Sequence, residues 1–268
     1  MPSSSAPSSL SKKKVLVLGA TGGTGKYVVS FLLEKGHSVV AVARSEEKLT
    51  ALLSKIQPEP KDYSQNLVMK ELSISDLNPS EMQELAEGCD SVVSCLGHTM
   101  TLQGMYQDGY FVSSVTKLVC QCMPKGCRLI VMGSEGVAKP DGSDPVRPLS
   151  ERFILFLLRW LVPPHADNEL VAQYLYKHQD TVDWTVVRPT DLIDGTVTEY
   201  DIFDTSEGSL FGSGVATRAN VADFMVRLVL EEQATWNNTY RHAMPVLKDK
   251  VLPVAESSKV DCTEKKDR

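Results

Sequence analysis

The feature that most constrains the fold is a glycine-rich turn between an apolar run and an amphipathic segment. In "VLVLGATGGTGKYVVSFLLEKG", Gly19, Gly22 and Gly25 form the pattern G-x-x-G-x-x-G. Residues 15–18 are typical of a buried strand, and residues 24–35 of a helix that ends at a glycine. A strand, a tight glycine turn and a helix in this order place unpaired backbone amides at a helix N-terminus.

This arrangement favours a bound pyrophosphate, and therefore a dinucleotide. The first glycine permits the turn, the second lets the backbone approach the diphosphate, and the third lets the helix pack on the strand. We assign Thr21, Gly23 and Thr24, which complete the turn, to the same site. The alternative is a glycine-rich turn that holds no ligand.

The end of the second predicted strand indicates which dinucleotide binds. In "VAVARSEEKL", Arg44 and Ser45 stand where an NAD site has an acidic residue for the ribose 2′-hydroxyl. A carboxylate would repel a 2′-phosphate, whereas a guanidinium can bind it with charge-assisted hydrogen bonds. The sequence therefore predicts NADP(H) as the cofactor. The alternative is a solvated surface arginine.

Apolar runs and amphipathic segments alternate along most of the chain, which predicts parallel βαβ units. We expect strands at residues 15–18, 39–43, 67–70, 91–96, 128–132 and 184–187, with helices at 24–35, 46–56, 79–87 and within 103–122. The predicted fold class is α/β, a Rossmann doubly wound parallel sheet with helices on both faces and a small C-terminal substrate-side region. A single domain spans residues 12–248, with its substrate-side elements mainly in 136–182 and 190–217. Residues 1–11 are predicted to be a disordered leader and 249–268 a loose charged tail.

Composition excludes several classes of function. The chain has 268 residues and a net charge of −6 without a basic stripe, which argues against nucleic-acid binding. The six cysteines have no paired CxxC spacing, so we expect reduced thiols and no metal site. The N-terminus has no apolar core of a secretory signal. We expect a cytoplasmic protein, although residues 1–11 leave organelle targeting open.

Several stretches carry a resemblance to a known family. "VLVLGATGGTGKYVV", "CDSVVSCLG", "RLIVMGS", "DWTVVRPT" and "ATRANVADFMVRLV" resemble the atypical short-chain dehydrogenase/reductase group. Within that group the chain is similar to NmrA-like proteins and to the biliverdin reductase B/flavin reductase branch, over roughly residues 13–230. The resemblance implies NADP(H) along the carboxyl edge of the sheet. It also implies that turns after successive strands line the cofactor, at Glu71, Leu96, Gly97, His98, Ser134, Pro189 and Thr190.

The sequence offers fewer signals for catalytic residues than for the cofactor. Members of the related classical superfamily use a Tyr-x-x-x-Lys pair with a serine, and the lysine lowers the tyrosine pKa. Ser134 follows the fifth predicted strand, but no tyrosine of "DNELVAQYLYKHQ" has a lysine four residues later. Tyr174 and His178, four residues apart, would share a helix face and form a Tyr–His proton relay, or they are ordinary helix-surface residues. His98 and His165 are interpreted as loop histidines.

The most apolar run, residues 152–164, is too short to span a bilayer. It predicts a helix that is buried on both sides, a lid over a hydrophobic substrate, or an association surface. The function predicted is an NADP(H)-binding oxidoreductase that reduces a small hydrophobic acceptor, namely a flavin, quinone or conjugated ketone. The alternatives are a non-catalytic NADP(H)-sensing regulator or scaffold of NmrA type, and a purely structural module. We expect a monomer or weak dimer.

Overall fold

The computed structural model describes residues 11–57, 63, 65–97, 110–161, 163–207, 214–230 and 239–250, without the side chains of 158–164. Several predictions lie outside the described residues. They concern His98, Cys262, nearly all of the leader, residues 251–268 of the tail, and the first part of the helix expected within 103–122.

Eight of the described strands form one large sheet in the order β3-β2-β1-β4-β5-β6-β10-β8. The bounds are β1 Lys14–Leu18, β2 Ser38–Ala43, β3 Leu67–Glu71, β4 Ser91–Ser94, β5 Arg128–Met132, β6 Asp183–Pro189, β8 Tyr200–Phe203 and β10 Val246–Asp249. Strands β3 to β6 run parallel, β10 continues parallel to β6, and β8 closes the edge antiparallel to β10. The order 3-2-1-4-5-6 is that of a doubly wound dinucleotide-binding fold, so the predicted fold class is confirmed.

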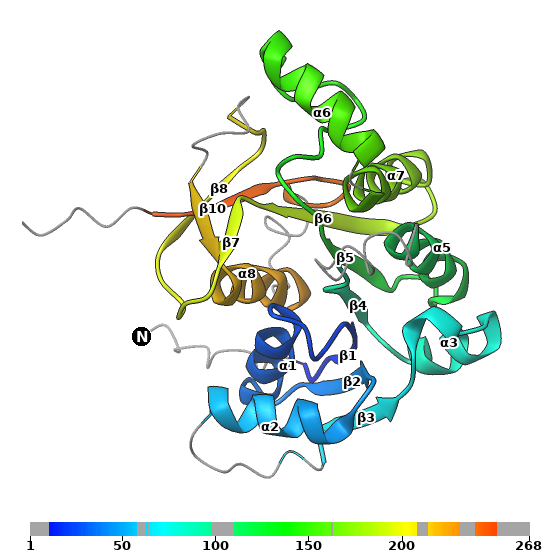
Figure 1. Cartoon of the computed structure of the whole chain (residues 1–268). Helices are drawn as coiled ribbons and strands as arrows, with labels where there is room; N and C mark the ends of the chain where they lie inside the picture. Colours follow the sequence, from blue (N-terminus) through cyan, green and yellow to red (C-terminus); the bar gives the residue numbers. More distant parts are fainter. Residues whose placement is uncertain are drawn as a thin grey trace, which may run out of the picture.

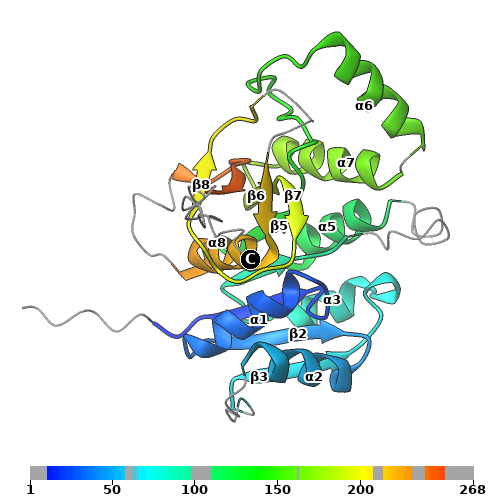
Figure 2. The ribbon, with the colours of Figure 1, turned by 60° about the vertical axis from the view of Figure 1, so that its left-hand side comes forward.

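Helices cover both faces of this sheet (Figures 1 and 2). One layer holds α1 Gly25–Glu34, α2 Glu46–Ile56 and α8 Arg218–Leu230. The other holds α3 Pro79–Ala86, α5 Phe111–Cys122 and α7 Pro163–Lys177, with α6 Leu149–Leu161 packed beyond α7. A short 3-10 helix, η1 Ile74–Asp76, follows β3.

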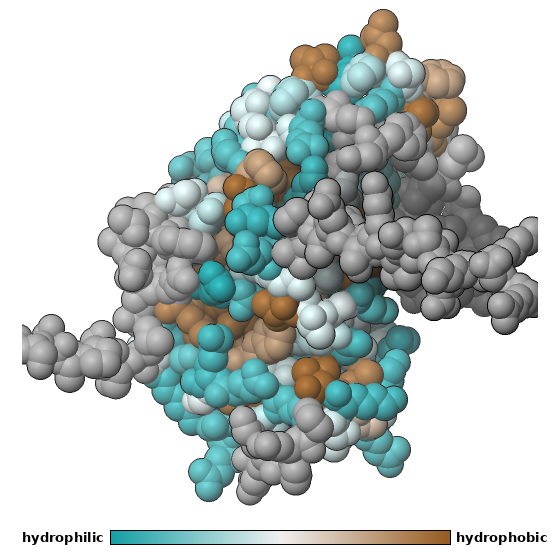
Figure 3. All heavy atoms as spheres, turned by 90° about the vertical axis from the view of Figure 1, so that its left-hand side faces the viewer, coloured by the Kyte–Doolittle hydropathy of each residue, from teal (hydrophilic) through white to brown (hydrophobic). Residues whose placement is uncertain are grey.

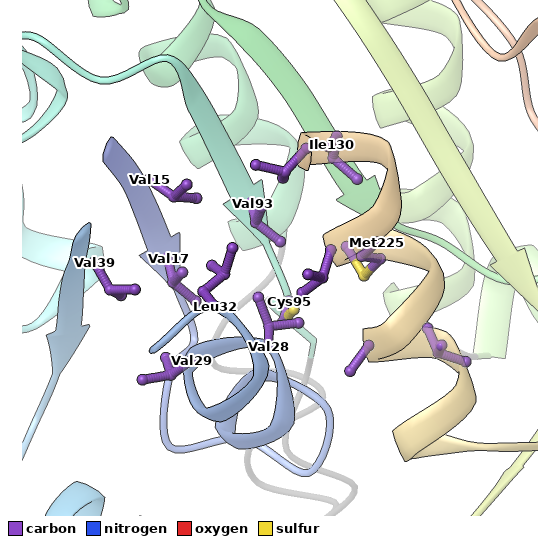
Figure 4. Close-up of a cluster of buried hydrophobic side chains, with 14 of the residues drawn as sticks. Val15, Val17, Val28, Val29, Leu32, Val39, Val93, Cys95, Ile130 and Met225 are labelled. Carbon is purple, nitrogen blue, oxygen red and sulfur yellow. The ribbon is translucent and has the colours of Figure 1, made fainter. Parts of the chain in front are cut away.

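The alternation of side chains along β1 divides the core into two layers. Val15 and Val17 point to the side of α1 and α8, whereas Leu16 and Leu18 point to the side of α3, α5 and α7. Figure 4 shows the first layer, where Val28 and Leu32 of α1 meet the strand valines and Met225 of α8. A strand buried on both faces is continuously apolar, which is why β1 was recognisable from sequence.

Four strands in the C-terminal part of the chain were not predicted. They are β8, β10, and the two strands of a small separate sheet in which β7 Asp191–Ile193 pairs with β9 Val215–Thr217. Strand β10 ends at Asp249, one residue into the segment that the sequence analysis assigned to the loose tail. The Asp249 carboxylate accepts hydrogen bonds from the Thr217 backbone N–H (2.9 Å) and the Asn220 side chain (2.6 Å). The charged sequence "VLKD" is short and amphipathic, and only its neighbours in space define it as a strand.

Candidate dinucleotide site

A pocket of about 450 Å³ lies at the carboxyl edge of the sheet, between the glycine turn and the ends of β2, β3, β4 and β5. Ligands of open α/β sheets bind at this edge, where the strand order reverses between β1 and β4. Its described lining residues are Gly19, Thr21, Gly22, Gly23, Thr24, Val42, Ala43, Arg44, Leu72, Ser73, Ile74, Ser75, Cys95, Leu96, Gly97, Phe111, Met132, Leu192 and Arg218. The pocket therefore brings together the predicted residues of the glycine turn and three further predicted residues, namely Arg44, Leu96 and Gly97.

The glycine turn has no room for larger residues at two positions. Gly19 has a positive φ of 77°, and a Cβ there would lie 2.8 Å from the Cys95 carbonyl oxygen. A Cβ on Gly25 would collide with the Gly19 carbonyl oxygen, where helix α1 meets β1. The Gly22 N–H donates to the Gly19 carbonyl at 2.9 Å and closes the turn. The turn therefore brings bare backbone to the pocket, the geometry that a diphosphate requires.

The polar residues after β2 and β3 have different environments. Arg44 is exposed and lines the pocket. Ser45 caps α2, because its hydroxyl accepts from the Lys48 N–H at 3.1 Å. Glu71 accepts from the Glu46 N–H at 3.3 Å. Neither Ser45 nor Glu71 is among the described residues that line the pocket, so Arg44 is the predicted 2′-phosphate residue that the pocket contains.

The predicted residues after β5 and β6 lie beyond the described lining. Ser134 follows Met132, which lines the pocket, by two residues. Pro189 ends β6, and Thr190 is buried with its hydroxyl 3.5 Å from the Leu247 carbonyl. Thr190 is therefore engaged with β10.

Arg218 is a pocket residue that sequence reasoning missed. It begins α8, and its side chain passes over the glycine turn, where a Cβ on Gly23 would meet its Cδ and Nε at 2.7 Å. Its Nη1 lies 3.0 Å from Asp194 Oδ1, which follows β7. The described lining thus contains two arginines and no carboxylate. Because Arg218 is distant in sequence from the glycine turn, only the fold reveals it.

Tyr174 and His178 do share a helix face, as expected, but the pocket does not include them. Their rings stack with centroids 4.1 Å apart, and His178 Nδ1 lies 2.7 Å from the Tyr174 carbonyl oxygen. Tyr174 packs on the α5 side of the core. Burial, with a further contribution from Cys120, raises the pKa of Tyr174, which is the reverse of what a proton-donating tyrosine needs. The catalytic assignment of these two residues finds no support in the geometry.

Helix α6 corrects another expectation. Phe153 and Phe156 are 62% and 52% exposed, and Leu157 is exposed as well. Figure 3 shows hydrophobic surface at the end of the molecule where α6 lies. The helix is not buried on both sides over its described side chains, which leaves the lid and the association surface as interpretations.

The described residues contain no group of three or more His, Cys, Asp or Glu side chains able to hold a metal ion, and their five cysteines are free. Burial raises the pKa of Cys95 to about 12, so this thiol beside the glycine turn is inert. None of the helices in the described part of the chain has the length and apolarity to cross a membrane.

The site fits a dinucleotide on the observations above: a bare glycine turn at a helix N-terminus, a pocket along the sheet edge and two cations. The family model described as NAD(P)H-binding matches residues 19–232. This chain belongs to the NAD(P)H-binding family.

The curated proteins that resemble part of this chain include reductases. The chloroplastic divinyl chlorophyllide a 8-vinyl-reductase of Arabidopsis thaliana is 32% identical over 82 residues, 31% of this chain and 20% of that protein. An NADPH-dependent pterin aldehyde reductase of the same organism is 41% identical over 54 residues, 20% of this chain and 22% of that protein. The matches thus span about a fifth of the length of these curated relatives.

Solved structures share the fold along nearly their whole length. A putative NADH-flavin reductase from Streptococcus pneumoniae has a TM-score of 0.57 and 21% identity, covering 89% of this chain and 100% of that one. An anaerobillin reductase from Escherichia coli O157:H7 has a TM-score of 0.61 and 20% identity, covering 90% and 100%. At this identity the likeness shows the fold alone.

Proposed function

We propose that this NAD(P)H-binding protein is an NADP(H)-dependent reductase of the atypical short-chain dehydrogenase/reductase group, similar to the NmrA-like and flavin-reductase branches. The observation that carries the cofactor proposal is the charge of the pocket: Arg44 and Arg218 line it, and no carboxylate does among the described lining residues. A 2′-phosphate favours a guanidinium where a free ribose favours an acid.

Different residues are proposed to bind different parts of the dinucleotide. In the proposal, backbone amides of the glycine turn hold the diphosphate, Arg44 holds the 2′-phosphate, and Arg218 supplies a second cation beside the turn. Leu96, Met132 and Leu192 provide apolar surface further along the pocket. When bound, a reduced nicotinamide supplies a hydride, and the chain contributes orientation and exclusion of water. We place Ser134 beside the reacting atoms.

The proposed substrate is a small hydrophobic acceptor, such as a flavin, a quinone or a conjugated ketone. These acceptors demand less of a proton donor than an alcohol or simple ketone does, which accommodates the absence of a Tyr-x-x-x-Lys pair in α7. The same absence favours a second candidate function, an NADP(H)-sensing regulator or scaffold without turnover.

One experiment separates the two candidates. Purified protein is titrated with NADPH and NADH by calorimetry, and NADPH oxidation is then followed by nicotinamide absorbance with FMN, menadione and 2-cyclohexenone. NADPH binding that is much tighter than NADH binding, with turnover of one acceptor, supports the reductase. Binding with no turnover, and different affinities for NADP⁺ and NADPH, supports the sensor. No dinucleotide binding overturns both.

The exposed apolar face of α6 (Phe153, Phe156 and Leu157) bears on oligomeric state. We propose a monomer or weak dimer, with α6 as the lid or the contact. Sedimentation of the wild type and of Phe153→Ser separates these: a dimer that the substitution abolishes supports the contact.

For the cellular location of the protein we propose the cytoplasm, with an organelle as the alternative.

A further inference from the structure

The amino end of α7 is anchored to the pocket side of the sheet. Asp167 is fully buried, and its carboxylate accepts hydrogen bonds from the backbone N–H groups of Val112 (2.7 Å) and Ser113 (3.0 Å) at the start of α5. Phe111, the preceding residue of α5, lines the nucleotide pocket. The first turns of α7 are thereby held close to the carboxyl edge.

His165, in the first turn of α7, faces the loop that follows β5. A Cβ built on Gly136 would lie 3.6 Å from His165 Cε1, 3.8 Å from His165 Nδ1 and 3.6 Å from Ser134 Oγ. The imidazole and the Ser134 hydroxyl therefore both lie next to Gly136, a residue that has no side chain. The Gly136 N–H donates to Ser134 Oγ at 3.3 Å, which occupies the oxygen as an acceptor and leaves its O–H to be donated elsewhere.

A carboxylate lies on the opposite side of the same imidazole. His165 Nε2 is 3.4 Å from Glu169 Oε1, one helical turn along α7, and both side chains are largely buried. A carboxylate beside one ring nitrogen favours one orientation of the imidazole, which leaves the other nitrogen for a different partner. Here the other nitrogen, Nδ1, lies next to Gly136, in the loop that carries Ser134.

We propose that Ser134, His165 and Glu169 form a proton-delivery chain that replaces the missing Tyr-x-x-x-Lys pair. This inference rests on the proposed reductase function. Ser134 is the catalytic residue, because it would touch the acceptor. His165 and Glu169 act through it as positioning and relay residues.

The proton balance for a quinone is simple. One C–H bond of the reduced nicotinamide breaks, and its electron pair and hydrogen pass to the quinone as hydride. The Ser134 O–H gives its proton to the quinone oxygen that becomes anionic, and protonated His165 restores the Ser134 hydroxyl. A proton from solvent then reprotonates His165. The sum is NADPH, quinone and one proton giving NADP⁺ and hydroquinone.

In this proton-delivery chain, α7 contributes residues of its first two turns and not Tyr174 or His178. Tyr174 and His178 lie 9 and 13 residues beyond His165. At the helical rise of ~1.5 Å per residue they are about 13 and 20 Å further along the axis. Helix α7 therefore presents to the Ser134 loop the histidine that sequence reasoning interpreted as ordinary.

The geometry is tested first without turnover, by NMR of the histidine ring ¹³Cε1–¹H signals. We expect Ser134→Ala to shift the His165 signal and Glu169→Gln to shift it as well. The His178 signal is the matched internal control, because its ring stacks on Tyr174, and it stays in place. A His165 signal that neither substitution moves overturns the proposal.

The chemistry is tested by NADPH oxidation with menadione as the acceptor. We expect His165→Ala to lower kcat by about 10²–10⁴-fold, the usual contribution of a positioned proton donor, while the dissociation constant of NADPH is unchanged. Added imidazole restores part of the rate, which a merely structural defect would not allow. Glu169→Gln lowers kcat less, and His178→Ala keeps wild-type kcat.

The possible outcomes distinguish a failure of the proposed relay from a failure of the proposed reductase function. If His165→Ala and His165→Gln both fold, bind NADPH and keep wild-type kcat, the relay is overturned and the reductase stands. If wild-type protein binds NADPH without oxidising it for any of the three acceptors, the reductase function fails and the relay fails with it.

Discussion

Asp144 and Arg188 form a buried ion pair that fastens the loop after β5 to the end of β6. Arg188 Nη1 lies 2.6 Å from Asp144 Oδ2, and Nη2 lies 3.1 Å from Oδ1, a bidentate geometry. The arginine side chain is fully buried and also donates to the carbonyls of Met244 and Val137. This pair attaches the loop after β5, which includes Ser134, to strand β6 of the sheet.

Removal of the carboxylate is expected to destabilise the fold strongly. Asp144→Ala leaves a buried guanidinium without its counter-charge, and we expect a loss of about 3–5 kcal/mol in the free energy of unfolding. Urea denaturation measures it. The matched control is Asp204→Ala, whose carboxylate is 83% exposed in its pair with Lys139. We expect it to cost at most about 1 kcal/mol. Equal losses would contradict this prediction.

The same pair predicts a dependence of stability on acid. Burial alone would raise the pKa of Asp144, but hydrogen bonds from Arg188 and from the Lys139 N–H, with the arginine charge, hold it below its ordinary 3.8. Because the folded-state pKa is depressed, this contribution is complete above pH 3.8 and is lost as pH falls through the folded pKa. We expect the wild-type free energy of unfolding to fall more steeply below that pH than that of Asp144→Ala. Parallel curves would show that Asp144 makes no such contribution.

Arg44 is expected to discriminate between the two cofactors. Arg44→Ala removes a charged donor facing the proposed 2′-phosphate, so NADPH should bind about 1.5–3 kcal/mol more weakly while NADH is little affected. Calorimetric titration of both dinucleotides measures the effect, and NADH serves as the control within one variant. An equal loss for both cofactors would remove the proposed 2′-phosphate contact.

Arg218 is expected to act on both cofactors alike. Its guanidinium lies over the glycine turn, beside the position proposed for the diphosphate, which NADPH and NADH share. We expect Arg218→Ala to weaken each by about 1.5–3 kcal/mol. Arg227→Ala is the matched control, because this arginine is on the same helix and pairs with Asp223 at 2.9 Å outside the pocket. An Arg218→Ala protein that binds both dinucleotides normally would assign Arg218 to a structural pair with Asp194.

Much of the fold was predictable because its signals are local. Val15 to Leu18 are buried on both faces, and Gly19 and Gly25 occupy positions where any side chain would meet backbone. Strand β10 was missed because "VLKD" has no distinctive pattern of its own, and its pairing with β6 and β8 joins segments far apart in the chain.

By itself the sequence determined the α/β class, the glycine turn and the position of Arg44, since each depends on neighbours a few residues away. Only the tertiary structure decided which residues of α7 lie near the loop that carries Ser134. Helical spacing correctly placed Tyr174 and His178 on one face, but the anchoring of Asp167 to the start of α5, 55 residues away, brings the first turn of α7 to the pocket side. The position of His165 beside Ser134, and of Arg218 over the glycine turn, follows from packing between distant segments, which no local pattern encodes.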